Sequence, residues 1–336
     1  MDKTFIRKLI LSYLPVNGYY RFDDIFQILP PDVTAPKMQF SNSHHPLIIE
    51  YCVDIPNNRI IQIEENSNTR ESDFDWALIG LASIEKLTEL IRLLNIVTNN
   101  RFFTYDINDQ SWFIPIGANA NEEAQNSCIW GQQFYSYPEF KTIITDFSKP
   151  NCSAINIEDA QTYYNRFGVN TGNRVDLPES INETLSNYFQ LDIDAREAFN
   201  SSAILFSNGI EIWSKMKSLS FAAIISSIET LVKYENRNLE VEKCQCCSQD
   251  KYSVTEKFKK FLCDFGSDIP LFKKYANDLY KMRSKILHNG SLFLGDLQLL
   301  PLEYDGKRIQ KENWFRNNLI QTTRICLVNW LIKGNH

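Results

Sequence analysis

The stretch FAAIISSIETLV, residues 221–232, decides the fold of the second half of the chain. Drawn as a helix, it carries apolar side chains on nearly every side, whereas a surface helix keeps one polar face. Such a helix must be surrounded by other helices, so we predict that it lies at the centre of a helical bundle. Its single carboxylate, Glu229, needs a partner or a route to solvent, because an unpaired buried carboxylate is costly.

The residues before this stretch also predict helices. A long helical region runs from Asp194 to about Tyr234, and we place an interruption near Gly209. An earlier helix covers the segment PESINETLSNYF, in which Pro178 suits the first helical position. The central stretch is therefore the later part of an extended helical region.

Three more helices are predicted downstream. In the helix over 253–266, Ser253 and Glu256 have the spacing of a capping box, and Gly266 is a stop signal. Two further helices, over 271–289 and 311–333, are marked by apolar side chains that recur on one face. These apolar residues are Leu271, Tyr275, Leu279, Met282 and Ile286 in the first of the two, and Phe315, Leu319, Cys326 and Trp330 in the second.

Residues 1–176 read differently, as an α/β or β-rich domain. Strand-like segments at 46–55 and 59–65 flank Pro-Asn-Asn, which predicts a hairpin, and segments at 102–106 and 111–116 predict a second one. Between them, Ser83 is the predicted N-cap of a helix over 83–97, with Ile84, Leu87, Ile91 and Leu94 at helical spacing. We therefore expect an α+β protein, in which an all-α bundle over 177–336 follows this domain.

Composition and length limit the class of protein. The chain has 336 residues, of which 43% are hydrophobic and 23% charged, which is typical of a globular protein with room for two domains. No apolar run approaches the ~18 residues that span a bilayer, and the N-terminus lacks the features of a signal peptide. We expect a cytoplasmic protein with no membrane partner, in which the eight cysteines are reduced thiols or metal ligands.

The net charge of −6 argues against a surface that is basic throughout. Residues 1–176 carry 14 Lys and Arg against 22 Asp and Glu, whereas 177–336 carry 21 against 19. Within 251–290 there are nine basic residues against four acidic ones. This local excess is enough for a small phosphate-binding patch, and it is also what a solvated helix face looks like.

Two groups of residues suggest metal binding. Cys244 and Cys247 have the C-x-x-C spacing with which two thiolates bind one tetrahedral zinc. A structural zinc needs two more ligands, and Cys263 is the nearest further thiol, so free thiols stay the default. The pair His44-His45 has no carboxylate cluster beside it, and we interpret it as part of a surface loop.

The segment DLYKMRSKILHNG, residues 278–290, carries the residues best suited to catalysis. On a helical wheel, Arg283 lies roughly 80° to one side of the apolar stripe and His288 roughly 140° to the other, so neither belongs to the core face. Both precede the predicted stop at Asn289-Gly290. One interpretation is an ordinary helix end, where cations such as Lys285 gain ~0.3–1 kcal/mol from the helix dipole.

Three blocks of sequence, in this order, point to a family. SFAAIISSIETLV is a hydrophobic helix with an embedded glutamate, KCQCCSQDKYSVTEKFKKFL is a cysteine cluster before a Lys- and Phe-rich helix, and LYKMRSKILHNG carries the Arg/His pair. Together, over about 177–300, they resemble the HEPN superfamily, and within it the ApeA-like HEPN proteins of bacterial anti-phage defence. Relatives often have Asn, Asp or His after the arginine and Gly after the histidine, where this chain has Ser284 and Asn289.

The resemblance implies a metal-independent endoribonuclease with no catalytic cofactor, acting as a toxin-like defence effector. RNA supplies its own nucleophile, the 2′-hydroxyl, and attack on the adjacent phosphate leaves a 2′,3′-cyclic phosphate end. We expect His288 to act as general acid or base and Arg283 to bind the phosphate oxygens. The resemblance further implies a homodimer, and we expect the domain over 1–176 to bind a phage-derived trigger or a protein partner.

Four neighbours have possible supporting roles. Glu229 either pairs with Arg283 and orients it or reaches the solvent edge of its helix. Ser284 and Asn289 flank the pair and are candidates to hold substrate or water, with helix capping the plainer role for Asn289. Tyr280 is either a platform for a base or a partly buried core residue.

Two other functions remain open at this point. The first is a non-catalytic HEPN module for dimerisation or for binding nucleotide or RNA, in which Arg283 and His288 are only a capped helix end. The second is a metal-dependent hydrolase, which the four histidines of the chain hardly support.

Overall fold

The architecture comes from a computed structural model of the chain. It describes residues 2–31, 45–55, 71–104, 111–115, 132–136, 140–166, 172–239, 254–266, 270–297 and 306–334. Two compact units divide the chain: the first comprises 1–159 with 169–178, and the second comprises 160–168 with 179–336.

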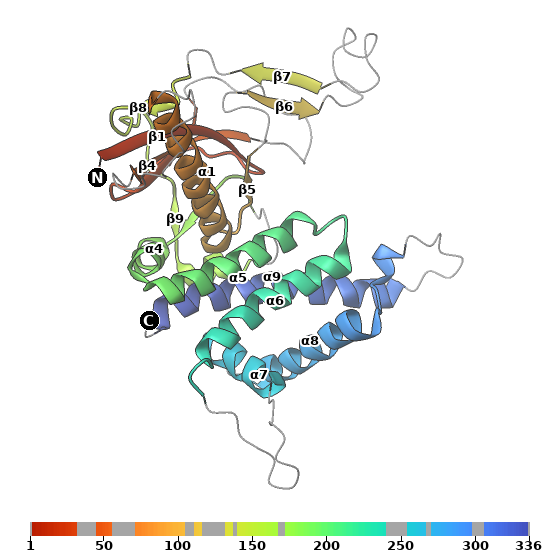
Figure 1. The fold of residues 1–336 in the computed structure, drawn as a ribbon. Coiled ribbons are helices and arrows are strands. Elements are labelled where there is room, and N and C mark those ends of the chain that lie inside the picture. The colour runs from red at the N-terminus through yellow and green to blue at the C-terminus, as the bar shows by residue number, and fades with distance from the viewer. Residues whose placement is uncertain are drawn as a thin grey trace, which may run out of the picture. The chain divides into compact units, whose positions relative to one another are not determined.

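An antiparallel sheet with one long helix forms the first unit (Figure 1). The sheet has the order β2-β3-β4-β1-β5, and the short strand β8 (Ile143–Ile144) also pairs with β1. The strands of this path are β1 (Asp2–Ser12), β2 (Tyr20–Phe22), β3 (Phe26–Leu29), β4 (His45–Ile55) and β5 (Phe102–Phe103), and the helix is α1 (Glu71–Val97). Two separate strand pairs complete the set: β6 (Ser111–Pro115) with β7 (Gln132–Ser136), and β9 (Ile157–Glu158) with β10 (Leu177–Pro178).

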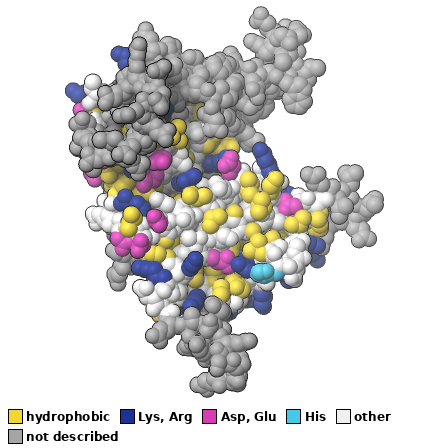
Figure 2. Space-filling view, in the orientation of Figure 1, with side chains coloured by type: hydrophobic (Ala, Val, Ile, Leu, Met, Phe, Trp, Pro, Cys, Tyr) yellow, Lys and Arg dark blue, Asp and Glu magenta, His cyan; other side chains and the backbone are white. Residues whose placement is uncertain are grey.

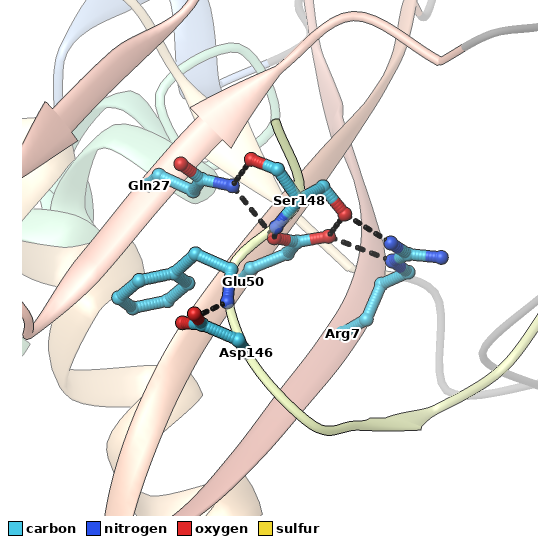
Figure 3. Close-up of polar contacts among 6 residues, drawn as sticks. Arg7, Gln27, Glu50, Asp146 and Ser148 are labelled. Carbon is cyan, nitrogen blue, oxygen red and sulfur yellow. Dashed lines mark hydrogen bonds and ion pairs between the residues drawn. The ribbon is translucent and has the colours of Figure 1, made fainter. Parts of the chain in front are cut away.

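A buried carboxylate on β4 links the segment around Ser148 to the sheet. Glu50 of β4 is fully buried, and both its oxygen atoms accept hydrogen bonds (Figure 3). The backbone N–H and hydroxyl of Ser148 donate over 2.7 and 2.6 Å, Nε of Arg7 over 2.8 Å, and Nε2 of Gln27 over 2.6 Å. Because four donors replace its hydration, this carboxylate stabilises the fold, and we assign it no chemistry.

Several expectations for the first half were wrong. Ser83 is not an N-cap: it lies within α1, is buried, and contacts the Tyr51 hydroxyl through its Oγ at 2.6 Å. The helix predicted over 83–97 is present as the later part of α1, and of its four predicted apolar residues Leu94 is fully buried, Leu87 and Ile91 are half-buried and Ile84 is exposed. The segments at 102–106 and 111–116 do not pair in the described part, because β5 pairs with β1 and β6 with β7.

The other two expectations for this half have mixed outcomes. The strand at 46–55 is confirmed as β4, which lies between β1 and β3, and the predicted strand at 59–65 falls outside the described residues. His45 opens β4 and is half-buried, so the loop interpretation is wrong for it, and burial lowers the pKa of its imidazole. His44 lies outside the described residues.

Helices dominate the second unit, which confirms the α+β class (Figure 1). A short helix, α3 (Ala160–Tyr164), belongs to this unit, and six longer ones follow within the described residues. These are α4 (Ile181–Gln190), α5 (Ile193–Glu211), α6 (Lys217–Glu235), α7 (Val254–Phe265), α8 (Pro270–Asn289) and α9 (Gly306–Lys333), with the 3₁₀ turn η1 (Leu294–Asp296) between the last two.

Helix α6 is the centre of this unit, as the stretch at 221–232 predicted. Its buried residues occupy most of its length, and α5, α7, α8 and α9 all pack against it. The chain does break between α5 and α6, but over 212–216 rather than at Gly209. Gly209 serves close packing instead, because a Cβ there would lie 2.5 Å from Cγ1 of Ile224 on α6.

The remaining predictions for the helices of this half have different outcomes. Gly266 ends α7 as predicted, and its N–H donates to the carbonyl oxygen of Leu262 over 2.8 Å. Pro178 does not open a helix, because it lies in β10. Ser253 of the capping box is outside the described residues, and the predicted apolar face of α9, Phe315 to Trp330, is buried.

Candidate functional site

The end of α8 lies where the sequence places it. The helix stops at Asn289, and Gly290 follows with φ of +63°, a left-handed conformation that favours glycine. The N–H of Ser291 then donates back to the carbonyl oxygen of Lys285 over 3.1 Å, which closes the turn. Arg283 and His288 are therefore held on the last two turns of a helix with a defined end.

The structure brings Arg283, His288 and Glu229 together. Nη1 of Arg283 lies 2.9 Å from Nε2 of His288, five residues further along the helix. On its other side, Nη2 of Arg283 donates to Oε2 of Glu229 over 3.1 Å, and Glu229 comes from α6, 54 residues earlier in the chain. Of the two alternatives for Glu229, pairing with Arg283 is therefore correct.

The ion pair between Arg283 and Glu229 has a second, weaker contact. Nε of Arg283 lies 3.0 Å from Oε1 of Glu229, but the N–H does not point along that line, so this contact is electrostatic rather than a hydrogen bond. The side chains of Arg283 and Glu229 are 18% and 21% exposed, whereas His288 is exposed. The guanidinium thus lies behind the exposed imidazole, and most of its side chain is shielded from water.

The contact with Arg283 restricts the state of His288 in this conformation. A guanidinium has only N–H donors, so Nε2 of the imidazole must accept. An imidazole that accepts at Nε2 is neutral and carries its proton on Nδ1. The lone pair of Nε2 therefore faces the guanidinium, and it becomes accessible to a substrate only when this contact opens.

The other three predicted site residues surround the pair without joining it. Tyr280 is half-buried; its ring packs on Phe258 of α7, with centroids 5.5 Å apart, and lies 5.8 Å from the guanidinium carbon of Arg283. Ser284 is half-buried and Asn289 exposed, and the described structure gives neither side chain a hydrogen bond. Capping by the Asn289 side chain is thus not observed.

Exposed apolar side chains near the pair were missed in the sequence. Leu287 and Leu292, on either side of His288 in the sequence, are 43% and 44% exposed. Figure 2 shows one face of the molecule, on which hydrophobic side chains are interspersed with basic and acidic ones. Leu287 lies off the apolar stripe of α8 on the helical wheel, and this is the signal that identifies it as an outward-facing leucine.

No metal centre is formed by the described part of the chain. Cys244 and Cys247 lie outside the described residues, so the predicted zinc site is not tested. Within the described ranges, no disulfide joins Cys52, Cys152, Cys263 or Cys326, and no group of three or more His, Cys, Asp and Glu has the geometry to bind a metal.

Comparisons with known proteins add no family. No protein-family model, no curated protein and no solved structure matches this chain. The interpretation of the site therefore depends on its geometry. Among the described helices, none combines the length and the apolar character needed to cross a lipid bilayer.

Proposed function

We propose that this chain is a metal-independent endoribonuclease of the HEPN type, acting as a toxin-like effector in anti-phage defence. The observation that carries the proposal is the 2.9 Å contact between Arg283 and His288 at the solvent-exposed end of α8. Glu229 supports it from α6, because a carboxylate behind a guanidinium orients it toward a substrate. Each of these residue types suits cleavage of a phosphodiester beside a free 2′-hydroxyl.

His288 is the group that moves a proton. Its Nε2 takes the proton of the RNA 2′-hydroxyl, and the 2′-oxygen then forms a bond to the adjacent phosphorus. The bond from phosphorus to the 5′-oxygen breaks, and that oxygen takes a proton from an imidazolium or from water. The products end in a 2′,3′-cyclic phosphate and a 5′-hydroxyl, and DNA is inert because it lacks the nucleophile.

Arg283 is the group that binds the phosphate. A guanidinium has five N–H donors; in Arg283 one N–H of Nη2 hydrogen-bonds to Glu229 and one of Nη1 contacts His288, so the second N–H of each of these nitrogens is left for phosphate oxygen atoms. Its positive charge stabilises the negative charge that develops on those oxygens in the transition state. When a phosphate enters, it replaces His288 as a partner of Nη1 and frees the imidazole for proton transfer.

A second copy of this chain is the partner that the face around the pair fits best. Leu287 and Leu292, which flank His288 in the sequence, are exposed apolar side chains, and apolar residues beside a polar centre are typical of interfaces. In a homodimer, two Arg283 and His288 pairs share one cleft, so one imidazole removes a proton while the other donates one. The first unit then has the task of binding a phage-derived trigger or a protein partner.

One observation favours a second candidate, a non-catalytic HEPN module. The guanidinium of Arg283 is bound on both sides within the chain, and a group with such partners can have a purely structural role, in which it holds α8 against α6. In that case the Arg283 and His288 pair is a structural link, and its loss affects stability alone.

The two candidates are separated by incubating the purified chain with total RNA in EDTA and determining the end groups of the products. The variants His288→Ala and Arg283→Ala are compared with Lys285→Ala, which removes a cation from the same helix end. We expect cyclic phosphate ends from the wild type and from Lys285→Ala, and at least a hundredfold slower cleavage by the other two. Intact RNA with every trigger and dimer preparation tested would reject the nuclease in favour of the binding module.

A further inference from the structure

The segment that follows His288 is anchored to the start of α6. Phe293 is almost fully buried, and its ring meets Phe221 of α6 edge-on, with centroids 5.4 Å apart. The N–H of Phe293 donates to the hydroxyl of Ser218 over 2.8 Å, and that of Leu294 donates to Glu312 of α9 over 2.9 Å. The chain is therefore held again only five residues after the imidazole.

Asp296 provides the strongest of these anchors. Its two carboxylate oxygens accept the N–H groups of Lys217 and Ser218, over 2.7 and 2.6 Å. These are the first amides of α6, and the first amides of a helix have no partner within the helix. A carboxylate at this end also lies favourably in the helix dipole. Asp296 thus caps a helix that begins 79 positions before it.

The residue at the N-cap position explains why this distant carboxylate is needed. Met216 occupies that position, and its side chain makes no capping hydrogen bond. A Ser, Thr, Asp or Asn there would satisfy the amides locally. Because Met216 cannot, the start of α6 is satisfied only while the segment after α8 lies against it. The capping of α6 and the placement of the segment after α8 against it therefore depend on each other.

The electrostatics of Asp296 agree with this geometry. Partial burial raises the pKa of the carboxyl, but hydrogen bonds from the Ser218 side chain and from the Ser218 and Lys217 backbone, with the charge of Lys217, outweigh it and hold the pKa below its usual value. Asp296 thus accepts these hydrogen bonds in its charged form, as a carboxylate. Nζ of Lys217 also donates to the carbonyl oxygen of Gly295 over 3.1 Å.

Two links to the same helix enclose His288. On one side, Arg283 binds Glu229, and on the other, Asp296 and Phe293 bind the first turn of α6. The two attachment points on α6, Glu229 and Ser218, are 11 residues apart, or about 17 Å along the helix. The end of α8 cannot move away from α6 unless one link opens.

We propose that Asp296 and Ser218 are positioning residues, which hold the end of α8 so that the His288 imidazole stays within reach of the Arg283 guanidinium. The proposal rests on the proposed function only for what the positioned imidazole does. Neither residue touches the substrate. Opening this link leaves Arg283 bound to Glu229 but lets His288 drift, and a shift of about 1 Å in a catalytic group slows a reaction up to about a hundredfold.

The test compares Asp296→Asn and Ser218→Ala with a matched control. Asp264→Asn makes the same change of charge at an exposed residue of α7 that has no described partner. A fourth variant, Asp296→Asn with Met216→Asp, restores a local cap to α6 without restoring the link to the segment after α8. Amide hydrogen exchange is measured over 217–222 and 286–297 of the full chain, together with kcat and KM for RNA and the melting temperature.

We expect Asp296→Asn to speed exchange in both segments and to lower kcat about tenfold with little change in KM, while Asp264→Asn matches the wild type. Ser218→Ala should do the same to a smaller extent. The double variant should recover the melting temperature and the protection of 217–222, but not the protection of 286–297 nor kcat.

Two results would overturn the proposal. The first is unchanged exchange over 286–297 in Asp296→Asn, which rejects the link even if the wild type proves not to cut RNA. The second is full recovery of kcat in the double variant, which reduces Asp296 to a helix cap. Absence of RNA cleavage by the wild type counts against the proposed function alone, because the exchange data still decide the link.

Discussion

The substitution Glu229→Gln tests how far the ion pair behind the imidazole supports the fold and the site. The change keeps the size of the side chain and removes its charge. It leaves Arg283 with one neutral acceptor where it had a carboxylate at 3.0 and 3.1 Å. The guanidinium then stays largely shielded from water but has lost its counter-charge.

The expected cost follows from the burial of the pair. Exposed ion pairs contribute ~0.2–1 kcal/mol, whereas loss of one member of a buried pair costs ~3–5 kcal/mol. Arg283 and Glu229 retain about a fifth of their side-chain exposure, so they lie between these limits. We expect the free energy of unfolding of the second unit to fall by about 2 kcal/mol. For a unit of this size, that corresponds to a melting temperature lower by ~4–8 °C.

Urea unfolding followed by far-ultraviolet circular dichroism measures this cost, with Glu211→Gln as the control. Glu211 is an exposed carboxylate at the end of α5, and we expect less than ~0.5 kcal/mol from its substitution. A double-mutant cycle with Arg283→Gln then isolates the pair, with an expected coupling of about 1–2 kcal/mol. A coupling near zero, with Glu229→Gln no worse than Glu211→Gln, would refute the reasoning and make Glu229 a solvent-edge residue.

Three other predictions concern the rest of the molecule. Gly209→Ala should destabilise the second unit by ~1–3 kcal/mol, because its Cβ would overlap Ile224; thermal melting shows this, and a rise in stability contradicts the packing. Arg324→Met should raise the unfolding free energy by ~1 kcal/mol or more. Its guanidinium is fully buried with the pKa lowered to about 10 by burial, and among the described residues only Gln321, at 3.0 Å, hydrogen-bonds to it. Asp296 should contribute stability above its unfolded pKa of ~3.9 and lose it as the pH falls through its lower folded pKa. The difference in unfolding free energy between wild type and Asp296→Asn should thus shrink from pH 7 toward pH 3, and a constant difference in urea titrations counts against this linkage.

The helices of the second unit were predictable because their signals are local. The apolar character of 221–232 required burial, and the spacing of Tyr275, Leu279 and Ile286 marked the core face of α8. Gly266 and Gly290 marked the ends of α7 and α8, since a left-handed or terminating residue acts on its own turn.

Strand pairing in the first unit was not predictable in the same way. The segments that became β5 and β6 were recognisable as extended, but they do not pair with each other: β5 pairs with the distant β1, and β6 pairs with β7. Which strands pair depends on contacts between distant segments, and alternation of side chains carries no information about the partner. Ser83 likewise looked like a helix start, and only the packing of α1 against Tyr51 placed it in the interior of the helix.

In the candidate site, too, one part was predictable from the sequence and another part was not. The sequence by itself determined that Arg283 and His288 lie off the core face, near the end of one helix, because helical geometry follows from spacing alone. Only the tertiary structure decided that Glu229, 54 residues earlier, binds Arg283, and that Asp296 caps a helix begun 79 positions before it. Both depend on which helices pack together, and that choice is made by the burial of the whole apolar surface rather than by any short stretch of residues.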